Sequence, residues 1–122
     1  MFTKEVLERF KNPKNTGELK DYNGRGKAGD VECSDVIELF IKFSDNKIEN
    51  AKFKVYGCPG AISTTDIFID LIKGKTIEQA LMITEKEISD SLGGLQTSHM
   101  HCSNLSMEAF RKAVKNYRDE NG

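Results

Sequence analysis

Hydrophobic and polar residues alternate most regularly between positions 36 and 55. Every odd position from 37 to 43 is apolar, and so is every odd position from 51 to 55, with four polar residues at 44–47 between the two runs. A period of two is typical of strands with one buried face, so this pattern predicts a β-hairpin. The glycine-rich segment 24–30 fits either a flexible turn or a third strand, although glycines are uncommon inside strands.

Other apolar residues recur at the spacing of helices, three or four positions apart, in segments 2–11, 61–72 and 105–117. Two shorter helices are expected after Thr76 and Thr84, because each threonine is followed three residues later by the glutamine or glutamate of a capping box. The predicted fold class is α+β. We expect a small antiparallel sheet of about three strands, covered on one face by helices, with a long C-terminal helix. The chain of 122 residues fits one domain, 1–122.

Composition narrows the classes of function. The chain has 18 basic and 19 acidic residues without a basic block, which argues against nucleic acid or an anionic membrane as its main partner. Its start lacks the apolar core of a signal peptide, and no apolar run approaches the ~20 residues that span a bilayer, so we expect a cytoplasmic protein. Three cysteines are an odd number, which favours metal binding or thiol chemistry over a disulfide framework.

The predicted hairpin brings two of the cysteines together. If Leu39 pairs with Phe53, Asp35 lies opposite position 57, and neighbouring strands are about 5 Å apart. Cys58 then lies near both Asp35 and Cys33. On an extended strand Cys33 and Asp35 project to the same side, because they are two residues apart. We therefore expect a site where the helical layer meets the end of the sheet.

Two of the cysteines are placed to ionise readily. Cys58 precedes Pro59, a favoured first residue of a helix, and Cys102 precedes Ser103-Asn104, a plausible N-cap of the last helix. A helix N-terminus stabilises a thiolate, which is the form that binds iron and the form that attacks sulfur. His101 adds an imidazole beside Cys102. Three thiolates with a carboxylate or imidazole as the fourth ligand would hold an iron-sulfur cluster less firmly than four thiolates, as transfer of the cluster requires.

Over nearly its whole length the sequence resembles the IscU/NifU family of iron-sulfur cluster assembly scaffolds. The segments that carry the resemblance are Val6 to Pro13, Cys33-Ser34-Asp35, Tyr56-Gly57-Cys58 and His101-Cys102-Ser103. The resemblance implies that Cys33, Cys58 and Cys102 are cluster ligands and that one of these three, with Cys102 as one candidate, accepts sulfur. It further implies that Asp35 or His101 completes the coordination or influences how easily the cluster leaves.

The resemblance also implies partners and cargo. A cysteine desulfurase of the IscS/NifS type would donate sulfur, the product would be a transient two-iron, two-sulfide (2Fe-2S) cluster, and acceptor apo-proteins would receive it. Zinc would be an occasional occupant of the cluster-free site. Relatives carry a Leu-Pro-Pro-Val-Lys segment for an Hsp70-type chaperone, but this chain has Leu95-Gln96-Thr97-Ser98-His99, so docking of that chaperone is not implied. The expected role is that of a non-catalytic scaffold.

Two other classes of function remain open from the residues themselves. Cys102 or Cys58 could be the nucleophile of a hydrolase or sulfurtransferase with His101 as its base, because a thiol beside an imidazole is an activated pair. Cysteine together with aspartate or histidine also suits the tetrahedral zinc of a structural zinc domain.

Overall fold

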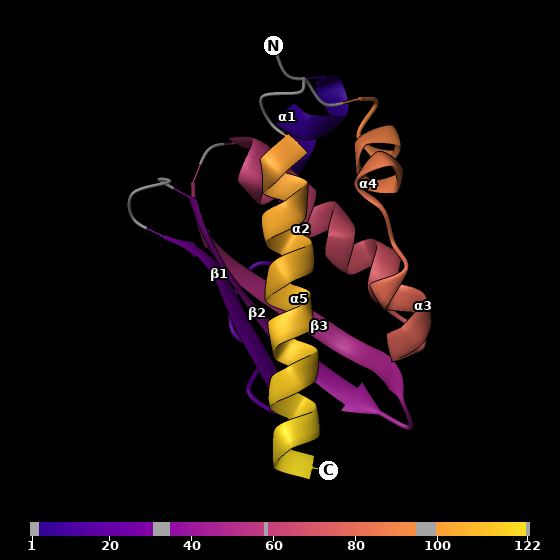
Figure 1. Ribbon diagram of the computed structural model, residues 1–122. Helices are drawn as coiled ribbons and strands as arrows, with labels where there is room; N and C mark the ends of the chain where they lie inside the picture. The colour runs from indigo at the N-terminus through magenta and orange to yellow at the C-terminus, as the bar shows by residue number, and fades with distance from the viewer. Residues whose placement is uncertain (1–2, 31–34, 58, 95–99, 122) are drawn as a thin grey trace.

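The chain folds into two layers, with helices covering one face of an antiparallel sheet (Figure 1). The computed structural model describes residues 3–30, 35–57, 59–94 and 100–121. The elements in this part of the chain are α1 (Lys4–Lys11), β1 (Gly24–Asp30), β2 (Asp35–Ser44), β3 (Lys47–Tyr56), α2 (Pro59–Ile72), α3 (Ile77–Leu81), α4 (Glu85–Ser91) and α5 (Met100–Asn121). The α+β class and the long C-terminal helix are confirmed.

The sheet has the order β1-β2-β3, and both strand pairs are antiparallel. Its register agrees with the prediction, since Leu39 pairs with Phe53 and Ile37 with Val55. A register shift does occur, but it lies between positions 42 and 43, near the hairpin turn. The pairing at the opposite end of β2 therefore keeps the register that the apolar pattern predicts.

The flexible-turn interpretation of residues 24–30 is wrong, because this segment is strand β1. Its glycines allow α5 to lie directly on the strand. A β-carbon on Gly26 would come closer than 3.0 Å to the carbonyl oxygen of Ala109 and to the amide nitrogen of Ala113, both backbone atoms of α5. Gly24 would likewise meet the carbonyl oxygen of Ala113. These glycines serve a close approach of two backbones, a role that glycine fills inside strands.

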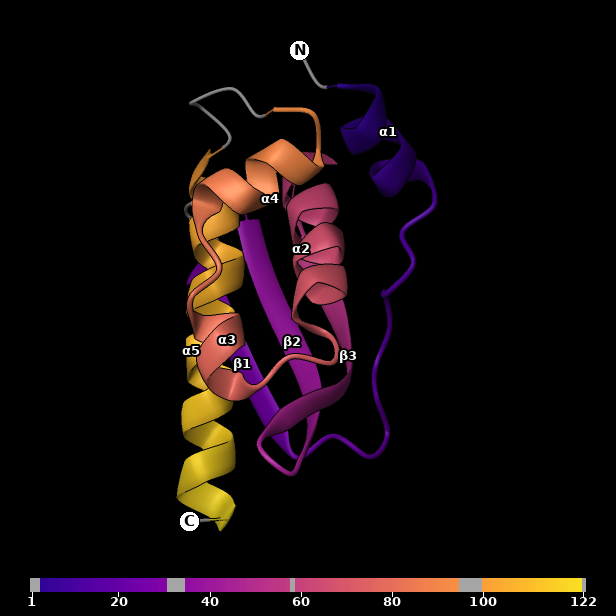
Figure 2. The ribbon, with the colours of Figure 1, turned by 90° about the vertical axis from the view of Figure 1, so that its right-hand side faces the viewer.

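The helix between the sheet and α1 is α2, and it is buried on more than the one face that its apolar spacing predicts (Figure 2). The expected core residues Phe68, Ile69 and Ile72 are buried, as is the rest of the predicted stripe. Fully buried polar residues also occur on this helix, namely Ser63, Thr64, Thr65 and Asp66. Buried polar groups need hydrogen-bond partners. Ser63 donates to the carbonyl oxygen of Val6 in α1, and Thr65 is hydrogen-bonded to Ser106 in α5. Asp66 accepts from Arg9 in α1, whereas the hydroxyl of Thr64 donates to Ala61 within α2 itself.

The predicted starts of the two short helices are confirmed. Thr76 caps α3 with both hydrogen bonds of the capping box, in partnership with Gln79. Thr84 caps α4 by accepting from the amide of Glu87. Among the described residues no helix combines the length and the apolar character needed to cross a membrane.

Candidate functional site

The elements that border the candidate ligands begin or end at one end of the molecule (Figure 1). β1 ends beside the start of β2, where Asp30 pairs with Asp35. β3 ends at the same place, because Tyr56 pairs with Val36. Both α2 and α5 also begin at this end. The fold thus brings together element ends that are far apart in the sequence.

Of the predicted ligands, Asp35 has a described side chain. Cys33 and Cys58 lie outside the described residues. His101 and Cys102 belong to the backbone of α5, and their side chains lie outside the described part. Among the side chains that are described, no three histidines, cysteines, aspartates or glutamates are grouped so that they could hold a metal ion. The meeting of the three cysteines therefore stays a prediction.

Asp35 is buried, and two glycines lie close against it. The residue is 5% exposed, and it starts the alternation that continues through the buried Ile37 and Leu39, on the helix-covered face. A β-carbon on Gly57 would come closer than 3.0 Å to Oδ1 of Asp35. A β-carbon on Gly29, which has a φ of 91°, would come closer than 3.0 Å to the backbone oxygen of Asp35. Asp35 and Gly57 are thus neighbours, as the predicted register requires.

The predicted start of the last helix is wrong. α5 begins at Met100, so Ser103 and Asn104 lie inside the helix instead of capping it. Serine and asparagine are good caps, but they are also tolerated in helices, so their presence does not prevent the preceding residues from being helical. Cys102 is the third residue of α5. It remains in the first turn, where backbone amides lack partners within the helix and the helix dipole is positive.

Buried hydroxyl groups join α2 to α5 near the candidate site. Oγ1 of Thr65 donates to the carbonyl oxygen of Ala61 at 2.8 Å and lies 2.9 Å from Oγ of Ser106. This second bond joins α2 to α5, whichever of the two hydroxyl groups donates. Ser106 lies one helical turn beyond Cys102, and a β-carbon on Gly57 would lie 3.2 Å from Cβ of Ala61. Contacts therefore run from the end of β3 through α2 to α5.

A buried carboxylate, that of Asp66, joins α2 to α1 and to the segment that follows α1. Its Oδ1 accepts from the backbone amides of Lys14 at 2.9 Å and Asn15 at 2.8 Å, and from Nδ2 of Asn15 at 3.1 Å. Its Oδ2 accepts from Nη1 of Arg9 at 2.8 Å. The same Arg9 nitrogen donates to Oδ2 of Asp70 at 2.6 Å. We call these five residues the Asp66 cluster.

Charges within the Asp66 cluster shift the pKa values of its members. Burial acts to raise the pKa of Asp70, but hydrogen bonds from Arg9 and Asn15 outweigh it, so the pKa is lowered. Burial likewise acts to lower the pKa of Arg9, and the hydrogen bonds to Asp66 and Asp70 outweigh it, so that pKa is raised. The sequence analysis missed the Asp66 cluster. Its signal is a pair of carboxylates one turn apart within the mostly apolar run of α2.

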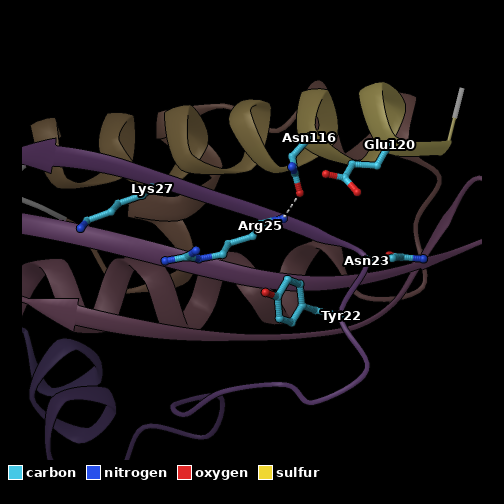
Figure 3. A pocket seen from close by; sticks show the side chains of 6 residues that line it. All are labelled: Tyr22, Asn23, Arg25, Lys27, Asn116 and Glu120. Atoms are coloured by element: carbon cyan, nitrogen blue, oxygen red, sulfur yellow. Dashed lines mark hydrogen bonds between the residues drawn. The ribbon is translucent and has the colours of Figure 1, made fainter.

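A surface pocket lies toward the opposite end of the molecule, and it contains none of the predicted ligands (Figure 3). Its volume is about 560 Å³, and it is lined by Tyr22, Asn23, Arg25, Lys27, Asn116 and Glu120. Arg25 already has partners within the protein: its backbone amide donates to Oδ1 of Asn116 at 3.0 Å, and its guanidinium forms an ion pair with Glu38. The pocket therefore adds no chemistry to the candidate site.

Comparison with protein families identifies the class of protein. The family model described as "NifU-like N terminal domain" matches residues 1–122. Together with the relatives described next, this match shows that the chain belongs to the NifU-like N-terminal domain family.

Curated relatives cover almost the whole chain. It is 43% identical over 122 residues to the iron-sulfur cluster assembly scaffold protein IscU 1 of Archaeoglobus fulgidus, covering 100% of this chain and 80% of the relative. It is 38% identical over 125 residues to IscU of Haemophilus influenzae, a protein of the same description, covering 99% of this chain and 98% of the relative. The nitrogen fixation protein NifU of Trichormus azollae is 39% identical over 126 residues, covering 96% of this chain and 42% of that protein.

Solved structures support the fold. A putative iron-sulfur cluster assembly scaffold protein for the SUF system from Fervidobacterium islandicum matches with a TM-score of 0.76 at 20% identity, covering 93% of this chain and 96% of that one. The N-terminal part of a NifU-like protein from Brucella abortus matches with a TM-score of 0.74 at 12% identity, covering 97% and 94%. At these identities the likeness concerns the fold alone.

Proposed function

We propose that this protein is an iron-sulfur cluster assembly scaffold, whose cargo is a cluster built on it from iron and sulfide and then passed to acceptor proteins. The observation that carries the proposal is the buried carboxylate of Asp35 beside Gly57, at the end of the fold where both flanking strands end and two helices begin. Relatives at 38% and 43% identity that bear the scaffold description support it. These relatives favour the scaffold over a cysteine-dependent enzyme or a structural zinc domain.

The proposed ligands are the thiolates of Cys33, Cys58 and Cys102, with Asp35 or His101 as the fourth donor. Cys33 precedes Asp35 by two residues, and Cys58 directly follows the glycine that Asp35 contacts. Cys102 is in the first turn of α5, where the helix dipole favours a thiolate. A carboxylate oxygen is a harder donor than thiolate and suits iron-sulfur chemistry less, so a fourth ligand of this kind favours release.

The proposed sulfur donor is a cysteine desulfurase that carries a persulfide. A thiolate of this chain attacks the terminal sulfur, a new S–S bond forms here, and the donor's cysteine leaves as a thiolate. Release of that sulfur as sulfide needs an electron pair from an external reductant, such as a thiol or an electron-transfer protein. The chain is thus a sulfur acceptor and a carrier, and it is not the catalyst of sulfur extraction.

The proposed product is a 2Fe-2S cluster, and zinc is a proposed occupant of the same donors when no cluster is bound. Three thiolates with one oxygen or nitrogen donor match the ligand preferences of zinc as well as those of iron in clusters. Both metals would compete for a single set of ligands, so zinc should slow cluster assembly.

The test is anaerobic incubation of the protein with ferrous iron, cysteine, a cysteine desulfurase and dithiothreitol. Visible absorption from sulfide-to-iron charge transfer should appear with the wild-type protein and should be lost in Cys33→Ser, Cys58→Ser and Cys102→Ser. A Ser44→Ala variant, altered at the far end of β2, should assemble the cluster normally. A colourless wild-type protein, or unchanged assembly in Cys58→Ser, would contradict the proposal.

A further inference from the structure

α3 packs beside α5 (Figure 2). Side chains of both helices line a shallow groove there. It has a volume of about 410 Å³ and is lined by Leu81, Arg111, Val114, Lys115, Arg118 and Asp119, which we call the basic groove. Its three cations follow one another at intervals of four and three residues, so they share one face of α5. All three are exposed, whereas Val114 is buried and forms part of the core.

The cations of the basic groove are largely uncommitted. Among the described side chains, neither Arg111 nor Lys115 forms an ion pair, while the neighbouring Lys112 pairs with Glu108 at 3.8 Å. Arg118 interacts through its charge with Glu78 of α3. The residues that line the groove thus include three cations and one carboxylate, Asp119, and Glu78 outside the lining interacts with Arg118. The excess of positive charge is available to an acidic partner.

One lining residue of the groove, Leu81, is an exposed apolar residue, and the next residue in the chain, Met82, is exposed as well. Leu81 is 37% exposed and Met82, the C-cap of α3, is 76% exposed, although the next residue, Ile83, is buried. A single exposed apolar residue needs no explanation, but two adjacent ones near a row of exposed cations form a composite surface. Methionine is a flexible side chain that adapts to the partner it contacts.

We propose that the basic groove is a docking site for an acidic amphipathic helix of a partner protein. Carboxylates at helical spacing on that helix would pair with Arg111, Lys115 and Arg118, and one of its apolar side chains would pack on Leu81 and Met82. Nucleic acid fits less well. Proteins that bind its backbone make several phosphate contacts, about 6–10 in typical cases, whereas this surface offers few cations and exposes apolar atoms instead.

The groove is remote from the candidate cluster site along α5. Arg111 and Arg118 lie nine and sixteen residues after Cys102, which corresponds to about 14 and 24 Å along the helix axis. A partner bound in the groove would leave the opposite end of the molecule free. The inference goes beyond the proposed function and does not depend on it, because the docking test involves no cluster.

The test is fluorescence anisotropy of the full chain with a labelled peptide of about 18 residues, long enough to form a helix, that carries leucines on one face and glutamates beside them. The peptide should bind, and its affinity should fall at least tenfold in Arg111→Glu/Lys115→Glu/Arg118→Glu. The matched control is Lys20→Glu/Lys27→Glu/Lys86→Glu, which makes the same change in net charge at exposed sites elsewhere. This control should retain binding within about twofold.

The apolar part of the proposal has its own variant. Met82→Ser removes an exposed apolar side chain without changing the charge. The variant should fold normally, and its affinity for the acidic peptide should fall severalfold. A peptide with lysine in place of glutamate should not bind. The proposal is overturned if the acidic peptide does not bind, if both triple variants lose affinity equally, or if duplex DNA competes as well as unlabelled peptide.

Discussion

The carboxylate of Asp35 occupies the space that a side chain at position 57 would need. A β-carbon on Gly57 would come closer than 3.0 Å to Oδ1 of Asp35, a distance that real β-carbons do not show. Gly57 immediately follows β3 and precedes Cys58, so the bare backbone at this point makes room for a buried carboxylate next to a proposed ligand. We infer that Gly57 is a positioning residue for Asp35.

The variant Gly57→Ala should therefore displace the Asp35 carboxylate without unfolding the protein. Overpacking of this kind costs about 1–3 kcal/mol, which urea denaturation would measure. In cluster transfer, Gly57→Ala should change the rate of cluster loss in the same direction as Asp35→Ala, because both remove the carboxylate from its place.

A double variant supplies the control for this prediction. When Asp35→Ala is already present, adding Gly57→Ala should have little further effect on the rate, because the displaced group is absent. Equal and additive effects of the two substitutions would contradict the positioning role of Gly57.

The sequence predicts this neighbourhood because sheet register depends on a simple pattern. Alternating apolar residues give the pairing of Leu39 with Phe53, and that pairing places Asp35 opposite Gly57. The alternation of apolar residues does not show why position 57 is a glycine. The reason depends on how deeply the Asp35 side chain is buried, which is a property of the folded molecule.

Other features could not be predicted because they depend on contacts between distant segments. The atoms that Gly26 meets belong to α5, more than 80 residues later in the chain, so local composition could not decide between a flexible turn and a third strand. The start of α5 was misjudged because serine and asparagine also occur inside helices, so Ser103 and Asn104 do not fix where the helix begins.

The variant Gly26→Ala should lower the free energy of unfolding by about 1–3 kcal/mol or more, because its new methyl group meets α5 backbone that cannot rotate away. Urea denaturation followed by circular dichroism would measure the loss. Lys27→Ala, at the adjacent exposed position of β1, is the control and should change stability by less than about 0.5 kcal/mol. Equal stability of Gly26→Ala and wild type would argue against tight packing of α5 on β1.

The pKa of Asp70 predicts how stability depends on pH. Because the folded protein lowers this pKa, the ionised carboxylate stabilises the fold above the unfolded value of about 3.9, and this contribution is lost as the pH falls through the lower folded value. Asp70→Asn should cost roughly 1 kcal/mol at neutral pH, since the carboxylate is partly exposed. As the pH falls from about 5 to about 3, the free energy of unfolding should decrease less for Asp70→Asn than for wild type.

The control for that comparison is Asp119→Asn, an exposed carboxylate at the end of α5 whose removal should leave the pH dependence close to that of wild type. Chemical denaturation at a series of pH values measures all three proteins. If Asp70→Asn and wild type lose stability in parallel on acidification, the ion pair with Arg9 is not the source of the dependence.

Removal of metal should leave the fold intact. The described core consists of apolar side chains between the sheet and the helices, such as Leu39, Phe53 and Phe110, and it includes no metal ligand. Addition of a strong chelator should therefore leave far-ultraviolet circular dichroism and the urea midpoint unchanged. Unfolding on chelation would instead favour a structural zinc domain.

The most direct test of the scaffold role is cluster transfer. Protein loaded with a cluster under anaerobic conditions is mixed with an apo-ferredoxin and a ferrous-iron chelator, and the acceptor is then separated and its spectrum recorded. The account predicts that the acceptor gains its cluster while the loaded protein loses its colour, and that little iron reaches the chelator. A cluster that stays on this protein, or iron that goes to the chelator without filling the acceptor, would contradict the central claim.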